Sequence, residues 1–397
     1  MKWTQDLIDR AYNLRKSGLL FGKVAKQLRE ETGCEDISAS AVNNALRYYL
    51  DEVRYDEVNS VDVLLEKRRA QNRARKDRAN LTALLDANLQ HSDILGAINE
   101  AASRISKTKP VSIKPSAAAS GTHMTAELLL SDLQIGKLMP SYNTEIAKKR
   151  LIAYTEAAIF KIKQHQKSGY VFDKIVLALI GDIIESDEKH SSSARSCDSS
   201  TAEQLANAQE YLFLYVIEPL ARLGIPMDIV CVTGNHDWNK SGLNMFKPGV
   251  VHLSWPMYNA LRMFSEYRGY SHLNYFIPEG CFHIHDIYGH NVLYEHGVGV
   301  STSEASMKAR RQARTQQTRK MITYFRMGDK HNISRFNEDT LVVNGAFFGS
   351  DTQGVEYSGI SGYESDAGQI MFFHVPRNDD RRLTIYDSFV IQLAHIS

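Results

Sequence analysis

Three polar residues with chemical potential, Asn235, His236 and Asp237, stand side by side in the stretch IVCVTGNHD. The residues before them are apolar and mostly β-branched, and Gly234 ends the run, so the pattern predicts a buried strand that leads into a loop. Loops at strand ends are where α/β folds place ligands and catalytic groups. An ordinary turn containing Asn and Asp is the alternative interpretation of this stretch alone.

Two earlier stretches repeat this arrangement. In KIVLALIGDIIES, an apolar run ends at Gly181 and Asp182, and in AELLLSDLQIGK, Asp132 follows Leu128 to Leu130. Two pieces downstream add further candidates, namely His296 in NVLYEHG, and Asp329 and His331 in YFRMGDKHN. The pattern therefore predicts several strands that each end beside a residue able to bind a metal ion.

The ordered set of motifs resembles the calcineurin-like metallophosphoesterases, whose pattern is D-x-H, G-D-x-x, G-N-H-D, a lone H before Gly, and G-H-x-H. This sequence has DLQ at Asp132, GDII at Gly181, GNHD at Gly234, EHG at Glu295 and GDKH at Gly328. Order and rough spacing agree from about Thr125 to Ser397. Within that family, the motifs resemble those of the SbcD-like DNA-repair nucleases and their phage-encoded relatives.

The resemblance implies a centre with two divalent metal ions bridged by Asp182. Metal one would take Asp132, Asp182 and His331, and metal two would take Asp182, Asn235 and His296. Gln134 is a further candidate ligand of metal one, with binding of a water molecule as its alternative role. Asp329 is a further candidate ligand of metal two, with a hydrogen bond to a histidine ligand as its alternative role. The resemblance also implies that His236 is not a ligand, and that it either donates a proton to the leaving oxygen or stabilises the transition state. We expect Asp237 to orient the imidazole of His236, as carboxylates do for catalytic histidines.

Two positions depart from the family pattern, because Gln134 and Asp329 each replace a histidine. Both side chains still offer an oxygen ligand. Oxygen-rich sites suit Mn²⁺ and Mg²⁺ better than Zn²⁺, so we expect Mn²⁺ as the preferred ion and Mg²⁺ as a weaker substitute. Because a neutral amide is the weaker replacement, ligand chemistry alone predicts firmer binding at metal two.

The N-terminal segment, residues 1–52, shows the spacing of three short helices. Thr4 is a candidate cap, and Gly18 and Gly33 are candidate stops. This arrangement resembles a helix-turn-helix DNA-binding domain, in which the third helix would expose Asn43, Asn44 and Arg47 to the DNA. A trihelical protein-interaction domain is the alternative.

Residues 53–109 form a predicted helical connector. Seven basic residues lie between Glu66 and Arg78, which indicates either a solvated helix or one that follows a phosphate backbone. A leucine-rich stripe follows, formed by Leu81, Leu84, Leu85, Leu89, Ile94, Leu95 and Ile98, and it predicts packing on the enzyme domain or pairing with a second subunit. Residues 110–124, with prolines and small residues, are expected to be a linker.

Residues 125–397 alternate strand and helix patterns, with helices expected at Thr144 to Lys167 and at Ala202 to Leu223. Short strands become denser toward the C-terminus. Sequential strand–helix–strand units favour parallel pairing. Together with the resemblance, this predicts an α/β fold of the sandwich type, with two sheets and helices on the outer faces.

The composition is that of a globular protein of 397 residues with a net charge of +1 and four scattered cysteines. Such cysteine usage favours a reducing compartment. No apolar run reaches transmembrane length and no signal-peptide core is recognised, so a cytoplasmic protein without a membrane partner is expected.

A basic segment, KARRQARTQQTRK, lies between His296 and Asp329 and includes Arg310, Arg311 and Arg314. A basic helix near a phosphoesterase centre, in a chain with a helix-turn-helix pattern, favours DNA as the partner. The leading hypothesis is a metal-dependent DNA nuclease, either an exonuclease or a structure-directed endonuclease. The alternatives are a phosphomonoesterase or protein phosphatase of the same fold, and a DNA-binding assembly protein with a decayed site.

Overall fold

The computed structural model describes residues 2–58, 61–111, 113, 120–189, 196–237, 247–349, 365–376 and 384–397. Parts of two expected loops, residues 112 and 114–119 of the linker and residues 190–195 of the serine-rich stretch after Asp182, lie outside the described residues. The chain divides into two compact units, Met1–Leu89 and Gln90–Ser397. None of the described helices combines the length and the apolar character that a membrane span requires.

The first unit contains the three predicted short helices, α1 (Gln5–Lys16), α2 (Phe21–Thr32) and α3 (Ala39–Val58). Their inward faces share a small core that includes Leu14, Leu28 and Leu46. Gly33 ends α2 in the left-handed conformation, as expected. Thr4 precedes α1, but its side chain makes no capping hydrogen bond, so the expected side-chain cap is absent. Its carbonyl oxygen accepts hydrogen bonds from the backbone N–H groups of Leu7 and Ile8 in the first turn.

The long helix α4 (Val61–Ser106) belongs to both units, because the division falls between Leu89 and Gln90. Ala97, Ala101 and Ile105 are buried in the main core of the second unit. The second compact unit therefore begins at residue 90, before the boundary expected at residue 125. Only the last part of the predicted stripe packs on this unit, since Leu81, Leu84, Leu85, Leu89 and Leu95 are exposed.

A six-stranded sheet forms the centre of the second unit, in the order β11-β10-β1-β2-β3-β4. Its strands are β1 (Thr122–Leu130), β2 (Tyr170–Ile180), β3 (Met227–Val232), β4 (Leu273–Phe276), β10 (Gly368–His374) and β11 (Ile385–Gln392). Strands β1 to β4 run parallel, and their registers pair Leu130 with Leu179 and Ile180 with Val232. The carboxyl ends of β1, β2 and β3 therefore lie at one edge.

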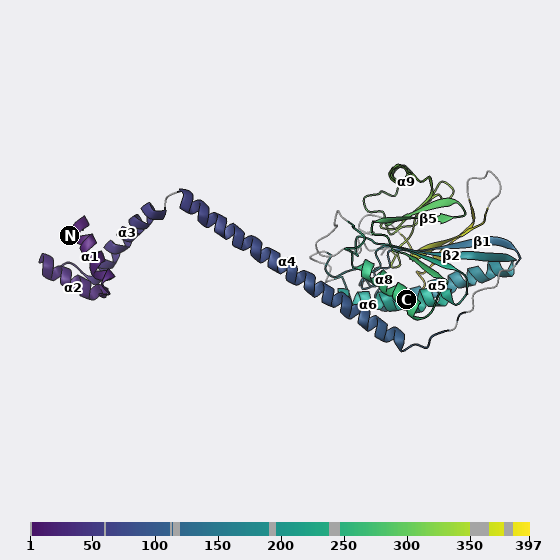
Figure 1. Ribbon diagram of the computed structural model, residues 1–397, viewed down its shortest axis with the longest axis horizontal. Coiled ribbons are helices and arrows are strands. Elements are labelled where there is room, and N and C mark those ends of the chain that lie inside the picture. Colours follow the sequence, from purple (N-terminus) through teal and green to yellow (C-terminus); the bar gives the residue numbers. More distant parts are fainter. Residues whose placement is uncertain are drawn as a thin grey trace. The chain divides into compact units, whose positions relative to one another are not determined.

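A five-stranded sheet packs against the first one (Figure 1). Its strand order is β5-β6-β7-β9-β8. Its strands are β5 (Phe282–Ile287), β6 (His290–Glu295), β7 (Ile322–Met327), β8 (Ser334–Phe336) and β9 (Leu341–Val343). Strands β6, β7 and β9 are parallel. Apolar side chains from both sheets, including Val176, Val230 and Tyr294, form the layer between them.

Helices cover the outer faces of both sheets. The six-stranded sheet packs on α5 (Thr144–Lys167), α6 (Thr201–Tyr211), a π-helical turn (Leu212–Ile217), α7 (Glu218–Ala221) and α8 (Ser254–Tyr267), whereas α9 (Glu304–Thr318) packs on the second sheet. The predicted α/β sandwich of two sheets with outer helices is confirmed. The helix predicted from Ala202 to Leu223 is interrupted by the π-helical turn.

A buried polar cluster ties the two sheets together. Glu127 on β1 accepts hydrogen bonds from Arg326 on β7 (3.1 Å) and from the Tyr294 hydroxyl on β6 (2.7 Å), and it lies 3.0 Å from the His374 imidazole on β10. All four side chains are fully buried. Burial by itself raises the pKa of Glu127, but Arg326 and His374 lower it to about 2. A buried charge needs such partners.

Candidate metal centre

The candidate ligands follow the carboxyl ends of strands from both sheets. Asp132 follows β1, Asp182 follows β2 and Asn235 follows β3, while His296 follows β6 and Asp329 follows β7. The backbone links the loops, since Gln134 N donates to Asp182 O (2.9 Å) and Gly328 N donates to His296 O (2.9 Å). Parallel strands thus bring together residues far apart in the sequence.

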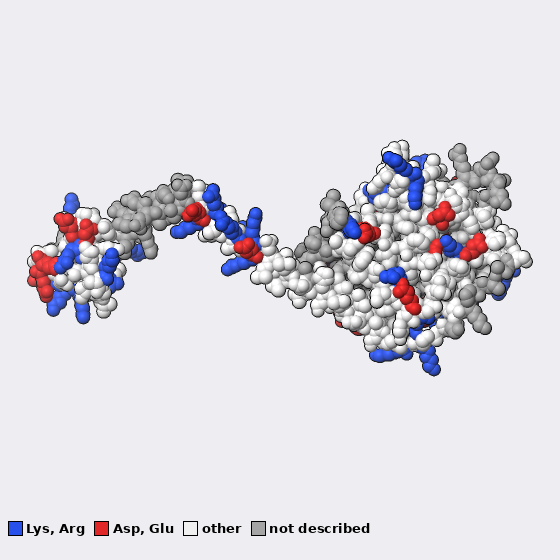
Figure 2. Space-filling model, viewed as in Figure 1, with Lys and Arg blue, Asp and Glu red and all other residues white. Residues whose placement is uncertain are grey.

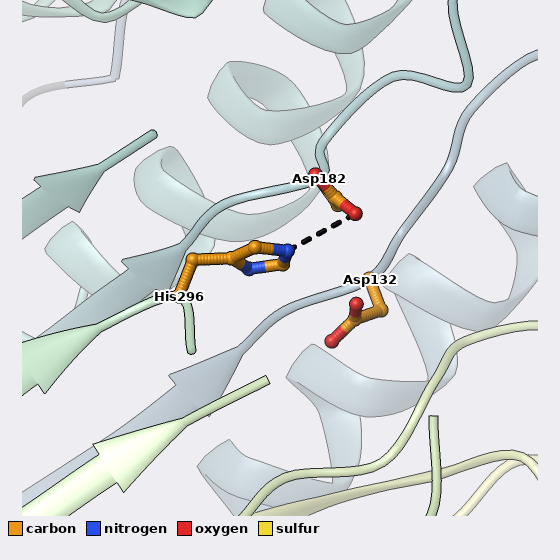
Figure 3. Close-up of side chains that lie close together, drawn as sticks. All are labelled: Asp132, Asp182 and His296. Atoms are coloured by element: carbon orange, nitrogen blue, oxygen red, sulfur yellow. Dashed lines mark ion pairs between the residues drawn. The ribbon is translucent and has the colours of Figure 1, made fainter. Parts of the chain in front are cut away.

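Asp132, Asp182 and His296 form the centre of this group (Figure 3). One potential ligand atom from each lies within 4.8 Å of the others, and all three residues are buried. His296 Nε2 lies 3.1 Å from Asp182 Oδ2, while its Nδ1 lies 2.7 Å from the carbonyl oxygen of Ile180. A backbone partner at Nδ1 fixes the ring and directs Nε2 into the centre, as in metal-binding histidines.

On one side of this group lie the residues expected at metal one. His331 Nε2 is 3.6 Å from Asp132 Oδ1 and 3.4 Å from the Gln134 side-chain nitrogen. The Gln134 side-chain oxygen is buried and has no hydrogen-bond partner among the described residues. Because an orphaned buried acceptor is costly, a cation is a fitting partner for it.

On the other side lie the residues expected at metal two. With the Asn235 amide oriented by its hydrogen-bond network, its nitrogen is 3.1 Å from Asp329 Oδ1 and 3.2 Å from His296 Nε2. Asp329 Oδ1 is itself 3.7 Å from His296 Nε2. All seven predicted ligands therefore converge, with Asp182 between the two sides, and this donor set fits divalent cations.

Five of the seven have a left-handed backbone, with φ of 52° at Asp132, 42° at Gln134, 52° at Asp182, 67° at Asp329 and 60° at His331. This conformation is unfavourable for residues other than glycine, and such strain concentrates at functional sites. The adjoining glycines allow close approach. A Cβ at Gly234 would lie 2.2 Å from Asp182 Oδ1, and one at Gly328 would lie 2.4 Å from Asp132 Oδ2.

His236 lies beside the centre, with its Nε2 3.9 Å from Asp182 Oδ2. The group that orients its ring is Glu185, whose carbonyl oxygen is 2.9 Å from His236 Nδ1 and whose carboxylate is 3.4 Å away. The sequence motifs did not indicate Glu185, because its contact depends on how the β2 and β3 loops fold together.

Asp237 does not orient His236, so this prediction is wrong. Its carboxylate is fully buried and accepts hydrogen bonds from backbone N–H groups of Gly234 (2.8 Å), Asp182 (3.1 Å) and Ile183 (3.1 Å). A short carboxylate that can reach three backbone donors satisfies them in preference to a single imidazole. Asp237 is therefore a positioning residue that joins the two loops.

The buried side chains of the centre have pKa values that are shifted in opposite directions. Burial alone raises the pKa of Asp182, but His296 and His236 hold this pKa well below its usual range. Burial lowers the pKa of His296, and Asp182 reverses this and raises it to about 10. Burial also raises the pKa of Asp132 to about 7 and lowers that of His331 to about 3.

The predicted nucleic-acid contacts fall into two groups. Asn43, Asn44 and Arg47 on α3 are exposed, as expected for residues that contact DNA. On α9, by contrast, Arg310 and Arg314 bond to Glu295 (2.9 and 2.8 Å), and Arg311 donates to Thr323 O (2.8 Å). These three arginines already hold α9 on its sheet, and a DNA role for them stays a prediction.

No protein-family model and no curated protein matches the sequence. Among solved structures, an archaeal phosphodiesterase is similar over 67% of this chain and 99% of its own, with 10% identity and a TM-score of 0.28. Vps29 from Entamoeba histolytica complexed with zinc is similar over 68% and 99% (8%, TM-score 0.26). A predicted phosphoesterase from Streptococcus pneumoniae is similar over 69% and 99% (11%, TM-score 0.27). At such low scores, the assignment of the centre depends on the residues of this chain.

Proposed function

We propose that this protein is a metal-dependent phosphodiesterase that acts on DNA. The observation that carries the proposal is the convergence of Asp132, Gln134, Asp182, Asn235, His296, Asp329 and His331 at the joined carboxyl edge of two sheets. Two divalent cations bound there would neutralise phosphate oxygens and lower the pKa of a bound water to supply a nucleophile. The oxygen-rich ligands favour Mn²⁺, with Mg²⁺ as the alternative.

The chain's own groups supply the remaining steps. Asp182 lies between the two sides and is the candidate bridging carboxylate. The His236 imidazole is held by Glu185 at the border of the centre, where it can donate a proton to the leaving oxygen. Asp237 and the close-packed glycines keep the loops in register.

DNA as the substrate is supported by the first unit and the connector. The exposed residues of α3 suit base edges and phosphates. Figure 2 shows Lys and Arg side chains along α4, where Lys67, Arg68, Arg69, Arg73, Arg75, Lys76 and Arg78 are all exposed. Such a basic helix is suited to phosphate contacts whose strength falls with salt.

Nuclease assays on end-labelled single-stranded and double-stranded DNA test this function, with a chromogenic phosphomonoester measured in parallel. We expect Mn²⁺-dependent cleavage of DNA and little hydrolysis of the monoester. Efficient monoester hydrolysis with intact DNA would instead identify a phosphomonoesterase. DNA binding without any hydrolysis would identify an assembly protein with a decayed site.

A further inference from the structure

A lysine that belongs to none of the sequence motifs reaches the candidate metal centre. Lys189 lies in the loop after β2. With the Asn235 amide in the orientation that its hydrogen-bond partners favour, the Lys189 ammonium donates to the Asn235 side-chain oxygen. In this orientation the amide nitrogen faces Asp329 and His296. Asn235 would bind metal two through its oxygen, so the amide would have to rotate and give up its hydrogen bond to Lys189.

The surroundings of Lys189 are strongly acidic. Its side chain is partly buried, which lowers its pKa, whereas the carboxylates of Asp182, Glu185 and Asp329 act in the opposite direction. A second ammonium is close by, since Lys330 Nζ lies 2.6 Å from Asp329 Oδ2. Two of the four groups expected to bind metal two thus already have a cationic partner.

We propose that the Lys189 ammonium competes with the second metal ion for the Asn235 oxygen and the acidic groups around it, and must move away when that ion binds. This inference rests on the proposed metal centre, and it assigns to Lys189 the role of weakening the binding of the second metal ion. An ammonium and a dication that share the same ligands repel each other, and the repulsion is stronger in a buried site than in water. Metal one therefore binds first, whereas ligand chemistry alone predicts that metal two binds more firmly.

Titration of the full-length protein with Mn²⁺, by calorimetry and by the electron paramagnetic resonance signal of free Mn²⁺, measures both binding steps without reference to activity. Lys189→Met removes the charge and keeps the aliphatic stem, and Lys189→Arg keeps the charge. Lys320→Met, at an exposed lysine of α9's C-terminal flank, is the control for loss of a surface charge.

We expect Lys189→Met to tighten the second Mn²⁺ by about tenfold or more, a change of about 1.4 kcal/mol, and to leave the first step unchanged. Lys189→Arg and Lys320→Met should behave like the wild type. Two steps with wild-type affinities in Lys189→Met would overturn the competition and leave the proposed function standing. So would unchanged affinities with weaker substrate binding, because Lys189 would then be a substrate contact. Failure of the wild type and of every variant to bind Mn²⁺ would overturn the metal centre itself and, with it, this inference.

Discussion

At the scale of single residues, the centre combines strained backbone with tightly limited space. Left-handed conformations at Asp132, Gln134, Asp182, Asp329 and His331 each carry a cost that the surrounding structure must offset. In return, side chains from five loops point at a common position. The arrangement is understandable if these side chains are ligands, because ligands must be held in place before the ion binds.

The roles of Asp182 and His236 give the first prediction. Asp182→Asn should abolish metal-dependent turnover, because the central group between the two cation positions loses its charge. His236→Ala should lower turnover by about 10²- to 10⁴-fold, the range for a lost general acid, while Mn²⁺ binding is retained. Parallel measurements of turnover and of Mn²⁺ stoichiometry distinguish the two roles. Loss of Mn²⁺ in His236→Ala together with full activity of Asp182→Asn would show that the roles are assigned wrongly.

Gln134 gives the second prediction. Gln134→His supplies an imidazole in place of an amide and should tighten position one and shift the preference from Mn²⁺ toward Zn²⁺ or Co²⁺. Histidine is among the residues that tolerate the left-handed backbone present here. Gln134→Ala, which removes the ligand without replacing it, is the matched control. Activity profiles across these metals test the idea, and maximal wild-type activity with Zn²⁺ would contradict it.

The order of the motifs and the family resemblance that it carries were sufficient to predict the seven residues that converge. The contacts of Asp237, Glu185 and Lys189 could not be predicted in this way, because they depend on how the β2 and β3 loops pack. In the sequence alone, a carboxylate that directly follows a histidine suggests an acid–base pair. In the folded chain, the groups that bond to the Asp237 carboxylate are backbone N–H groups.

At the scale of elements, apolar runs located β1, β2, β3 and β6, which end at the centre, and α5 was predicted with its observed bounds, Thr144–Lys167. The strands β4, β7 and β8 and the helix α8 were not predicted. The pairing of strands across the two sheets was also beyond local patterns. In particular, Glu127 and Arg326 are separated by 199 positions in the chain, and only their burial shows that they belong together.

The Glu127 cluster gives the third prediction. Glu127→Gln leaves the buried Arg326 without its counter-charge and should lower the free energy of unfolding by about 3–5 kcal/mol near neutral pH. The folded-state pKa of Glu127 is about 2, below its ordinary value of 4.5. The contribution of the Glu127 charge to the free energy of unfolding is therefore complete above about pH 4.5 and is lost as the pH falls toward 2.

Urea-induced unfolding at pH 7 and at pH 3 measures both parts of this prediction. The difference between the wild type and Glu127→Gln should be smaller at pH 3. Glu266→Gln, which removes an exposed carboxylate paired with Arg262 at 2.8 Å, should cost no more than about 1 kcal/mol. An equal difference between the wild type and Glu127→Gln at both pH values would show that the Glu127 charge does not cause the effect.

At the scale of the whole molecule, two compact units share the helix α4. Sequence composition placed a domain boundary at the linker, whereas the contacts within the folded chain place it between Leu89 and Gln90. The linker composition was evident in the sequence, but the burial of Ala97 and Ala101 was not, because alanines on a helix give a weak hydrophobic signal. Pairing of two copies through the exposed leucines of α4 stays a prediction.

The fourth prediction concerns the division of labour between the units. Deletion of residues 1–89 should weaken duplex binding by about tenfold or more and reduce its salt dependence, because phosphate contacts release counterions. Turnover of a small phosphodiester should survive. Deletion of residues 1–110 is the matched comparison, and it should lower thermal stability because it also removes the buried face of α4. Unchanged affinity for DNA at several salt concentrations would leave the first unit as a structural or protein-binding module.

The most direct test of the central claim is hydrolysis of bis-p-nitrophenyl phosphate by metal-free full-length protein during titration with Mn²⁺, with p-nitrophenyl phosphate measured in parallel. The account predicts no turnover before Mn²⁺ is added, saturable activation by Mn²⁺, faster hydrolysis of the diester than of the monoester, and no activation of Asp182→Asn. Turnover that is independent of metal, equal activity of Asp182→Asn, or hydrolysis of the monoester alone would contradict it.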